Sequence, residues 1–242
     1  MLHRWFVALG MIVAAASTSP AQTVSITACG QTVPAGQAGV VEADLTCPTD
    51  IGTFAVRVEK LGSLDLAGHT LVGGNAGVRC LDRCTVTSSG GAGTIRDTGT
   101  AGIAVVSEGV GRLTVSNVVL ESNEFCILTD FLHGKVTGEQ LTLTGCGLGI
   151  QARKVLITGL TASGNYTVAQ ARRTMLRDST VSTSSGTAFT GKAVTLTNSS
   201  ITGSASGVDL LTDRRPRLVN STCEVSRKLS QPTETWGVCA ND

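Results

Sequence analysis

The chain has few aromatic and few charged residues. Aromatic side chains make up 3% and charged side chains 15% of its 242 residues. Such low charge, together with 41% hydrophobic residues, excludes most disordered chains and leaves enough apolar material for a core. The scarcity of Trp and Tyr argues against a site that stacks neutral sugars on aromatic rings. The abundance of Thr, Ser, Val, Gly and Leu favours many short strands joined by turns.

The chain also lacks an excess of either charge and lacks the common catalytic motifs. Its 19 Lys and Arg against 18 Asp and Glu give a formal net charge of +1, so we expect no nucleic-acid partner. It contains no phosphate-binding loop, no Gly-x-Ser-x-Gly and no His-Glu-x-x-His. It also contains no Asp-Asp pair, no His-Gly-His run and no cluster of three carboxylates.

The first residues have the pattern of a cleaved signal peptide, which we assign to residues 1–21. His3 and Arg4 precede an apolar stretch over residues 5–16, and small residues lead up to a cleavage position after Ala21. A membrane anchor is the alternative, but the stretch is short for a bilayer span, and no later segment is long and apolar enough. We therefore expect a secreted or periplasmic protein with no membrane span after cleavage.

All eight cysteines follow this leader, and an even number in an exported chain indicates disulfides. Eight cysteines allow 105 pairings, and our prediction joins neighbours in the sequence. A zinc site is the alternative, but only Cys80 and Cys84 have the short spacing of metal ligands, so we expect no metal. The predicted pairs are Cys29 with Cys47, Cys80 with Cys84, Cys126 with Cys146, and Cys223 with Cys239.

A repeat of 19 to 25 residues runs through most of the chain. Its marker is a column of residues that tolerate a left-handed backbone, each placed between two β-type runs. Apolar residues recur two positions before this column and three after it, and a third apolar column precedes each unit. The marker column consists of Gly68, Asn117, Gly138, Gly159, Asp178, Asn198 and Asn220, with Ala92 in the same register.

Three short strands per unit, repeated about eight times, predict a parallel solenoid with one continuous core. Thr, Ser and Asn ladders should exchange hydrogen bonds along its axis. A leucine-rich repeat has a similar period, but the Thr-, Val- and Gly-rich segments lack helical periodicity. A β-sandwich is the third possibility, and the regular single bend per unit argues against it.

The run Leu64–Leu71, the Gly-Ile and Gly-Val strand starts and the Asn-centred bends resemble the right-handed parallel β-helix repeat family, in the pectate-lyase-like superfamily. The resemblance covers residues 52–223 and implies an all-β, single-stranded coil of right-handed sense, which agrees with the chirality of parallel crossovers. We expect disulfide-tied caps at its ends, over residues 22–51 and 224–242, with Trp236 covering the last coil rather than binding a sugar.

Secreted members of this superfamily often act on acidic polysaccharides, so the resemblance directs attention to charged loops. The candidate catalytic residues are His133, Lys135 and Arg153, with His133 as acid or base. In repeat register Asp130 should stack on Arg153, and the alternative interpretation of this patch is a solvated ion pair that blocks sheet aggregation. The candidate binding residues are Glu108, Arg112, Asp130 and Lys154.

Further basic residues gather in the C-terminal half and could meet an anionic glycan along one edge. They are Arg172, Arg173, Arg177, Lys192, Arg214, Arg215 and Arg217.

Because no convergent catalytic cluster is visible, the first hypothesis is a non-catalytic, monomeric solenoid for binding or cell-envelope structure, with polysaccharide as the possible partner and no cofactor. The second is a lyase or hydrolase of acidic glycans, which as a lyase would need Ca²⁺. The third is an adhesion protein that self-assembles through an end coil.

Overall fold

The computed structural model describes residues 23–50, 52–98, 103–121, 123–183, 186–203 and 207–242. The predicted signal peptide, residues 1–21, lies outside them.

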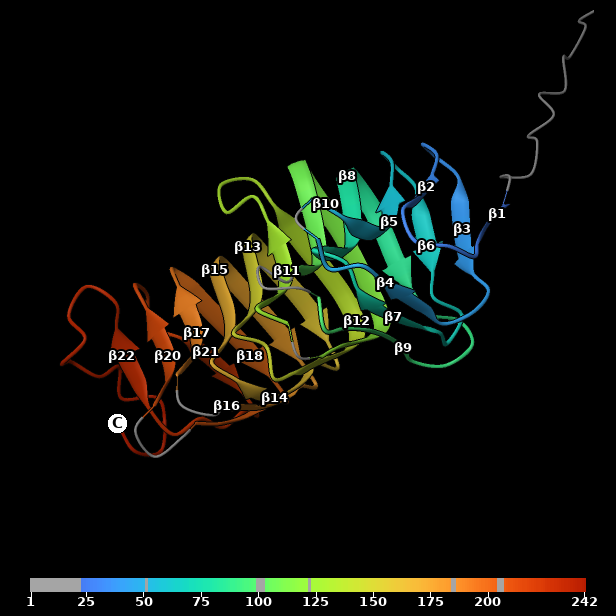
Figure 1. Cartoon of the computed structure of the whole chain (residues 1–242). Coiled ribbons are helices and arrows are strands. Elements are labelled where there is room, and N and C mark those ends of the chain that lie inside the picture. Colours follow the sequence, from blue (N-terminus) through green and yellow to red (C-terminus); the bar gives the residue numbers. More distant parts are fainter. Residues whose placement is uncertain (1–22, 51, 99–102, 122, 184–185, 204–206) are drawn as a thin grey trace, which may run out of the picture.

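The described chain is an all-β parallel solenoid of about eight coils, and none of its described residues is helical. Figure 1 shows the strands stacked side by side, from the N-terminal coil in blue to the C-terminal coil in red. The strands form three parallel ladders, which we call sheets 1, 2 and 3, and the long strands β8, β10, β12, β13 and β15 pass from one sheet to the next. This arrangement confirms the predicted solenoid.

Sheet 1 consists of β2 (Gln31–Val33), β5 (Phe54–Val58), the first parts of β8 (Ala76–Thr87) and β10 (Ile103–Glu121), β11 (Phe125–Thr129), the first parts of β13 (Leu148–Thr158) and β15 (Thr167–Arg177), β17 (Thr187–Gly191), β20 (Val208–Thr212) and β22 (Ser226–Lys228). Sheet 2 consists of β1 (Thr23–Ile26), β3 (Ala38–Val41), β6 (Ser63–Asp65), the second part of β8, the middle of β10, the first part of β12 (Lys135–Thr144), the second parts of β13 and β15, β18 (Ala193–Thr197) and β21 (Arg217–Val219). Sheet 3 consists of β4 (Leu45–Cys47), β7 (Thr70–Gly73), β9 (Gly93–Arg96), the ends of β10 and β12, β14 (Thr161–Asn165), β16 (Thr180–Thr183) and β19 (Ser200–Thr202).

The core is a column of aliphatic side chains inside the three sheets. Along each strand buried and outward residues alternate, as in β18, where Val194 and Leu196 are buried between outward neighbours. Phe189 is the largest fully buried side chain of the described chain, and the rest of the core is mainly Leu, Ile, Val and Ala. Neighbouring coils therefore share one apolar interior, which explains how a chain with so few aromatics folds.

The predicted bends are left-handed at most positions of the marker column. The backbone φ is positive at Gly68, Asn117, Gly159, Asp178, Asn198 and Asn220.

The prediction of a left-handed bend is wrong at two positions of the marker column. The bend of the coil after Asn117 is at Gln140, with φ 51°, and not at Gly138, because Val115 pairs with Gly138 and Val118 with Leu141. Gly138 occupies a strand position, where an added Cβ would lie 2.3 Å from the carbonyl oxygen of Val115. In the earlier coil it is Gly91 that has positive φ, and not Ala92.

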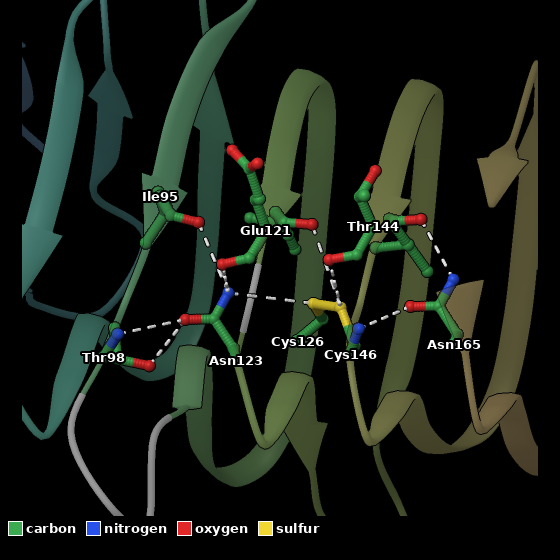
Figure 2. The surroundings of a disulfide bond; sticks show 10 residues. Ile95, Thr98, Glu121, Asn123, Cys126, Thr144, Cys146 and Asn165 are labelled. Atoms are coloured by element: carbon green, nitrogen blue, oxygen red, sulfur yellow. Dashed lines mark hydrogen bonds between the residues drawn. A yellow bond between two sulfur atoms is a disulfide. The ribbon is translucent and has the colours of Figure 1, made fainter. Parts of the chain in front are cut away.

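Polar ladders run along the axis, as predicted. On the surface, Asn198 Nδ2 donates to Asp178 Oδ1 at 3.0 Å, and Asn220 Nδ2 donates to Asn198 Oδ1 at 3.4 Å. Inside the coil, Asn123 and Asn165 occupy equivalent positions on either side of Cys146, which is bonded to Cys126 (Figure 2). These hydrogen bonds hold successive coils in one register.

The structure contains four disulfides, and they join the cysteines that are neighbours in the sequence: Cys29–Cys47, Cys80–Cys84, Cys126–Cys146 and Cys223–Cys239.

Both segments expected to be caps contain strands of the stack. In the N-terminal segment, β2, β3 and β4 pair with β5, β6 and β7, and in the C-terminal segment β22 pairs with β20. Trp236 is half-buried, and Lys228 Nζ lies 5.5 Å from its ring centroid.

Candidate functional site

The corner between sheets 1 and 2 lets two consecutive side chains point outward. In β13, Ala152 and Val155 are buried, whereas Arg153 and Lys154 between them are not. The backbone N–H groups of Arg153 and Lys154 both donate to the carbonyl oxygen of Gly134, at 3.0 and 3.1 Å. This shared acceptor marks the place where the strand turns, so each coil can present two side chains here instead of one.

Basic residues occupy this corner in successive coils. Arg112 pairs in register with Lys135, Lys135 with Lys154, and Lys154 with Arg173. Together with neighbouring corner residues they line a groove of about 400 Å³, which we call the basic groove. Its eight cationic residues are Arg112, Lys135, Arg153, Lys154, Arg172, Arg173, Lys192 and Arg214.

None of these eight side chains forms an ion pair within the part of the chain that the structure describes. The ion pairs found there involve other groups, such as Arg57 with Glu59 and Lys228 with Glu234. Unpaired like charges on one open surface raise the local positive potential, although the chain as a whole is almost neutral. The groove is therefore suited to an anion that spans several coils.

Five of the seven candidate residues from the sequence line this groove. They are Arg112, His133, Lys135, Arg153 and Lys154.

Glu108 and Asp130 do not line the groove. Glu108 Oε1 accepts a hydrogen bond from Nε of Arg79, one coil earlier, at 2.9 Å and lies 2.8 Å from Nη2 of the same guanidinium in an ion pair. Asp130 lies beside the groove through its contact with His133.

Asp130 and His133 form a pair in the turn that follows β11. Asp130 Oδ2 lies 2.8 Å from His133 Nδ1, and Asp130 Oδ1 accepts the N–H of Leu132 at 2.7 Å. The hydrogen bond with His133 and then that from Leu132 hold the pKa of Asp130 below its usual value.

The repeat register places Asp130 beside Arg153 of the next coil, but the two do not pair. Asp130 forms no ion pair with Arg153 and pairs with His133 of its own turn instead. The reason is local, since an Asp at the start of a tight turn can bond to groups two and three residues later.

Four further groove residues belong to the basic residues of the C-terminal half, which the sequence analysis expected along one edge but did not join to the candidate site. These are Arg172, Arg173, Lys192 and Arg214. The signal that could have placed them is a small residue, then one or two cations, then an inward residue, as in Ala152–Val155, Ala171–Thr174 and Gly191–Val194.

A second hollow of about 440 Å³ lies further along the same strands on the outer face of sheet 2. It begins two residues after the cations, with Thr137, Leu156 and Met175. Met175 is 41% exposed, although it is apolar. The basic groove thus borders a hollow whose near part is neutral, whereas Glu139 and Arg177 also line this hollow.

Comparison of the chain with protein-family models, curated proteins and solved structures gives no match in any of the three. Within the described ranges no helix is suited to span a bilayer. The same ranges hold no group of three or more His, Cys, Asp or Glu side chains arranged to bind a metal ion. The four disulfides indicate an oxidising environment, such as the extracellular space.

Proposed function

We propose that this protein is an exported, non-catalytic solenoid that binds an acidic polysaccharide in the basic groove. The observation that carries the proposal is the alignment, on one corner of the solenoid, of eight cations from six successive coils that form no ion pair with any described residue. Export is supported by the disulfides and by the leader-like sequence at the N-terminus.

A linear polymer fits this site better than a compact anion. Neighbouring parallel strands are about 4.8 Å apart, so the cations recur at that interval along the axis. A compact anion would reach only one or two coils, whereas a polymer lying along the groove would meet all of them. Because the chain has only 3% aromatic residues, such binding depends on charge and hydrogen bonds rather than on ring stacking.

The second candidate function is cleavage of the same class of polymer, by elimination or hydrolysis. It is favoured by the Asp130–His133 pair, which places an oriented imidazole beside Lys135 and Arg153 in the groove. A histidine held by a carboxylate is suited to proton transfer, and nearby cations would stabilise an anionic sugar.

One experiment separates these two functions. Immobilised polygalacturonate and neutral dextran are tested for binding in a NaCl series, and the chain length of each polymer is followed with and without Ca²⁺. Binding to polygalacturonate alone, weakened by salt and with no shortening, supports the proposal. Shortening that stops in His133→Gln supports the enzyme, and no binding to either polymer contradicts both.

A charge variant tests whether the groove is the site. Arg112→Gln with Lys135→Gln should weaken binding to polygalacturonate about ten-fold, because two of the aligned charges are lost. Lys60→Gln with Arg96→Gln is the matched control, since it removes two cations that do not line the groove. Equal loss in both variants would show that the groove is not the site.

A further inference from the structure

The basic groove carries two cations per coil at its centre. Arg153 and Lys154 are consecutive, and so are Arg172 and Arg173, which lie in register with them one coil later. Because coils are about 4.8 Å apart, four positive charges fall within about 5 Å along the axis.

The number of positive charges per unit length at the centre of the groove exceeds the number of negative charges per unit length of a simple uronate polymer. A sugar residue in an extended glycan spans about one coil, so a glycan with one carboxylate per sugar offers one negative charge to each pair of cations. The second cation of each pair then remains unneutralised. A glycan with two anionic groups per sugar would neutralise both members and release more bound counterions.

The side chains present also favour strongly charged oxyanions. Five of the eight cationic groove residues are arginines, whose planar guanidinium offers two parallel donors to sulfate, phosphate or carboxylate oxygens.

Few carboxylates stand near the groove to repel such a ligand. Asp130 is hydrogen-bonded to His133. Asp213 is exposed next to Arg214 in the sequence, and Glu139 lines the far part of the second hollow. None of the three is among the groove-lining residues.

We propose that the ligand of the basic groove is a densely charged glycan with about two sulfate or phosphate ester groups per sugar, lying along the solenoid axis. This inference rests on the proposed function and makes it more specific. The groove would prefer such a polymer over a polyuronate because each of the two central coils would neutralise a pair of charges.

The test compares the affinities of dextran sulfate, dextran phosphate, polygalacturonate and neutral dextran at equal concentrations of anionic groups. Dextran sulfate or dextran phosphate should bind about ten-fold more tightly than polygalacturonate, with a steeper decrease in affinity as NaCl rises. The tighter of the two esters identifies the group that the site prefers.

The variant Arg153→Gln with Arg172→Gln leaves one cation in each central pair. It should lower the affinity for the ester polymers by about ten-fold and that for polygalacturonate by less than about three-fold. The control Lys60→Gln with Arg96→Gln should change neither, and circular dichroism establishes that each variant is folded.

The outcomes distinguish this inference from the proposed function. If polygalacturonate binds as tightly as the ester polymers, or if Arg153→Gln with Arg172→Gln weakens the binding of all acidic polymers equally, the inference is wrong and the proposed function stands. If no acidic polymer binds, both are wrong.

Discussion

Asn123 is a polar residue inside an apolar solenoid, and each of its side-chain atoms has a partner. Its Oδ1 accepts hydrogen bonds from the N–H and the hydroxyl of Thr98, the latter at 2.7 Å, and its Nδ2 donates to the carbonyl oxygen of Glu121 at 2.8 Å (Figure 2). The side chain therefore forms hydrogen bonds to the preceding coil and to the last residue of β10 in its own coil, at a place where water cannot replace it.

We predict that Asn123→Ala lowers the free energy of unfolding by about 2–4 kcal/mol, because it leaves several buried donors and acceptors without partners. Urea unfolding followed by circular dichroism measures the change. Asn198→Gly is the control, since glycine tolerates the left-handed backbone there and only two exposed ladder bonds, to Asp178 and from Asn220, are lost, so the expected change is within about 0.5 kcal/mol. Equal effects of both substitutions would contradict this prediction.

Asp209 is a buried carboxyl group in β20 with one satisfied oxygen. Oδ2 accepts the N–H groups of Glu224 and Val225, whereas Oδ1 has no hydrogen-bond partner among the residues that the structure describes. Burial raises the pKa of Asp209 most, and the charges of Glu224 and Asp242 raise it further, against the two N–H groups that lower it.

The raised pKa means that Asp209 disfavours the folded state once it is ionised. The contribution of Asp209 to the stability of the folded state is therefore most favourable below its unfolded-state pKa of about 3.9. This contribution decreases as the pH rises through its folded-state pKa. We predict that Asp209→Asn has little effect near pH 4 and that its stability relative to the original chain increases towards pH 7. Urea unfolding at several pH values measures this difference, and a difference that falls with pH would contradict the assignment. Asp50→Asn, at an exposed position, should show no such trend.

At the scale of a coil, the sequence predicted the strands better than the register of each one. The marker column succeeded where Asn or Asp stands between two runs, because few other conformations suit these residues there. It failed at Gly138, because glycine is found both at left-handed bends and where two backbones approach closely. Gly138 is of the second kind, since its backbone lies close to the carbonyl oxygen of Val115. Gln140 is not a residue type that marks a bend, so only the strand pairing shows that it lies in the column.

The disulfides act on the coil over different lengths of chain. Cys126–Cys146 closes a separation of 20 residues and links successive coils, whereas Cys80–Cys84 closes a separation of four within β8. We predict that Cys126→Ala with Cys146→Ala lowers the free energy of unfolding by about 3 kcal/mol and Cys80→Ala with Cys84→Ala by about 2 kcal/mol, because the longer loop restricts the unfolded chain more. Urea unfolding of both variants gives the comparison, and the opposite order would show that native packing outweighs loop length.

At the scale of the whole molecule, the sequence showed the basic residues of the groove but not their convergence. Their spacing of 19 to 23 residues alone does not reveal that the corner turns two consecutive side chains outward. The partner of Asp130 could not be predicted from the repeat either, because the turn at residues 130–133 changes the register between β11 and β12 and supplies His133 as a local partner. The repeat determines which residues stack, whereas loops and corners determine which side chains meet.

The basic groove implies that binding depends on where the charges lie and not on how many there are. The formal net charge of the chain is only +1, so a uniform charge distribution would hold a polyanion weakly. A charge-matched variant tests this difference. Arg153→Gln with Arg172→Gln removes two groove cations, and Asp50→Asn with Glu124→Gln removes two exposed carboxylates elsewhere, so the net charge is unchanged.

We predict that this four-site variant binds dextran sulfate about ten-fold more weakly than the original chain, because only the local charge of the groove is lost. The pair Asp50→Asn with Glu124→Gln alone raises the net charge by two and should leave the affinity within about two-fold, since both positions lie outside the groove and are screened by salt. Dissociation constants for both variants in 150 mM NaCl, about physiological ionic strength, measure the effect. The contrary outcome is that affinity follows net charge, so that the four-site variant binds normally and Asp50→Asn with Glu124→Gln binds more tightly. The cations would then act only through the overall electrostatic field of the protein, and their alignment in the basic groove would have no special role.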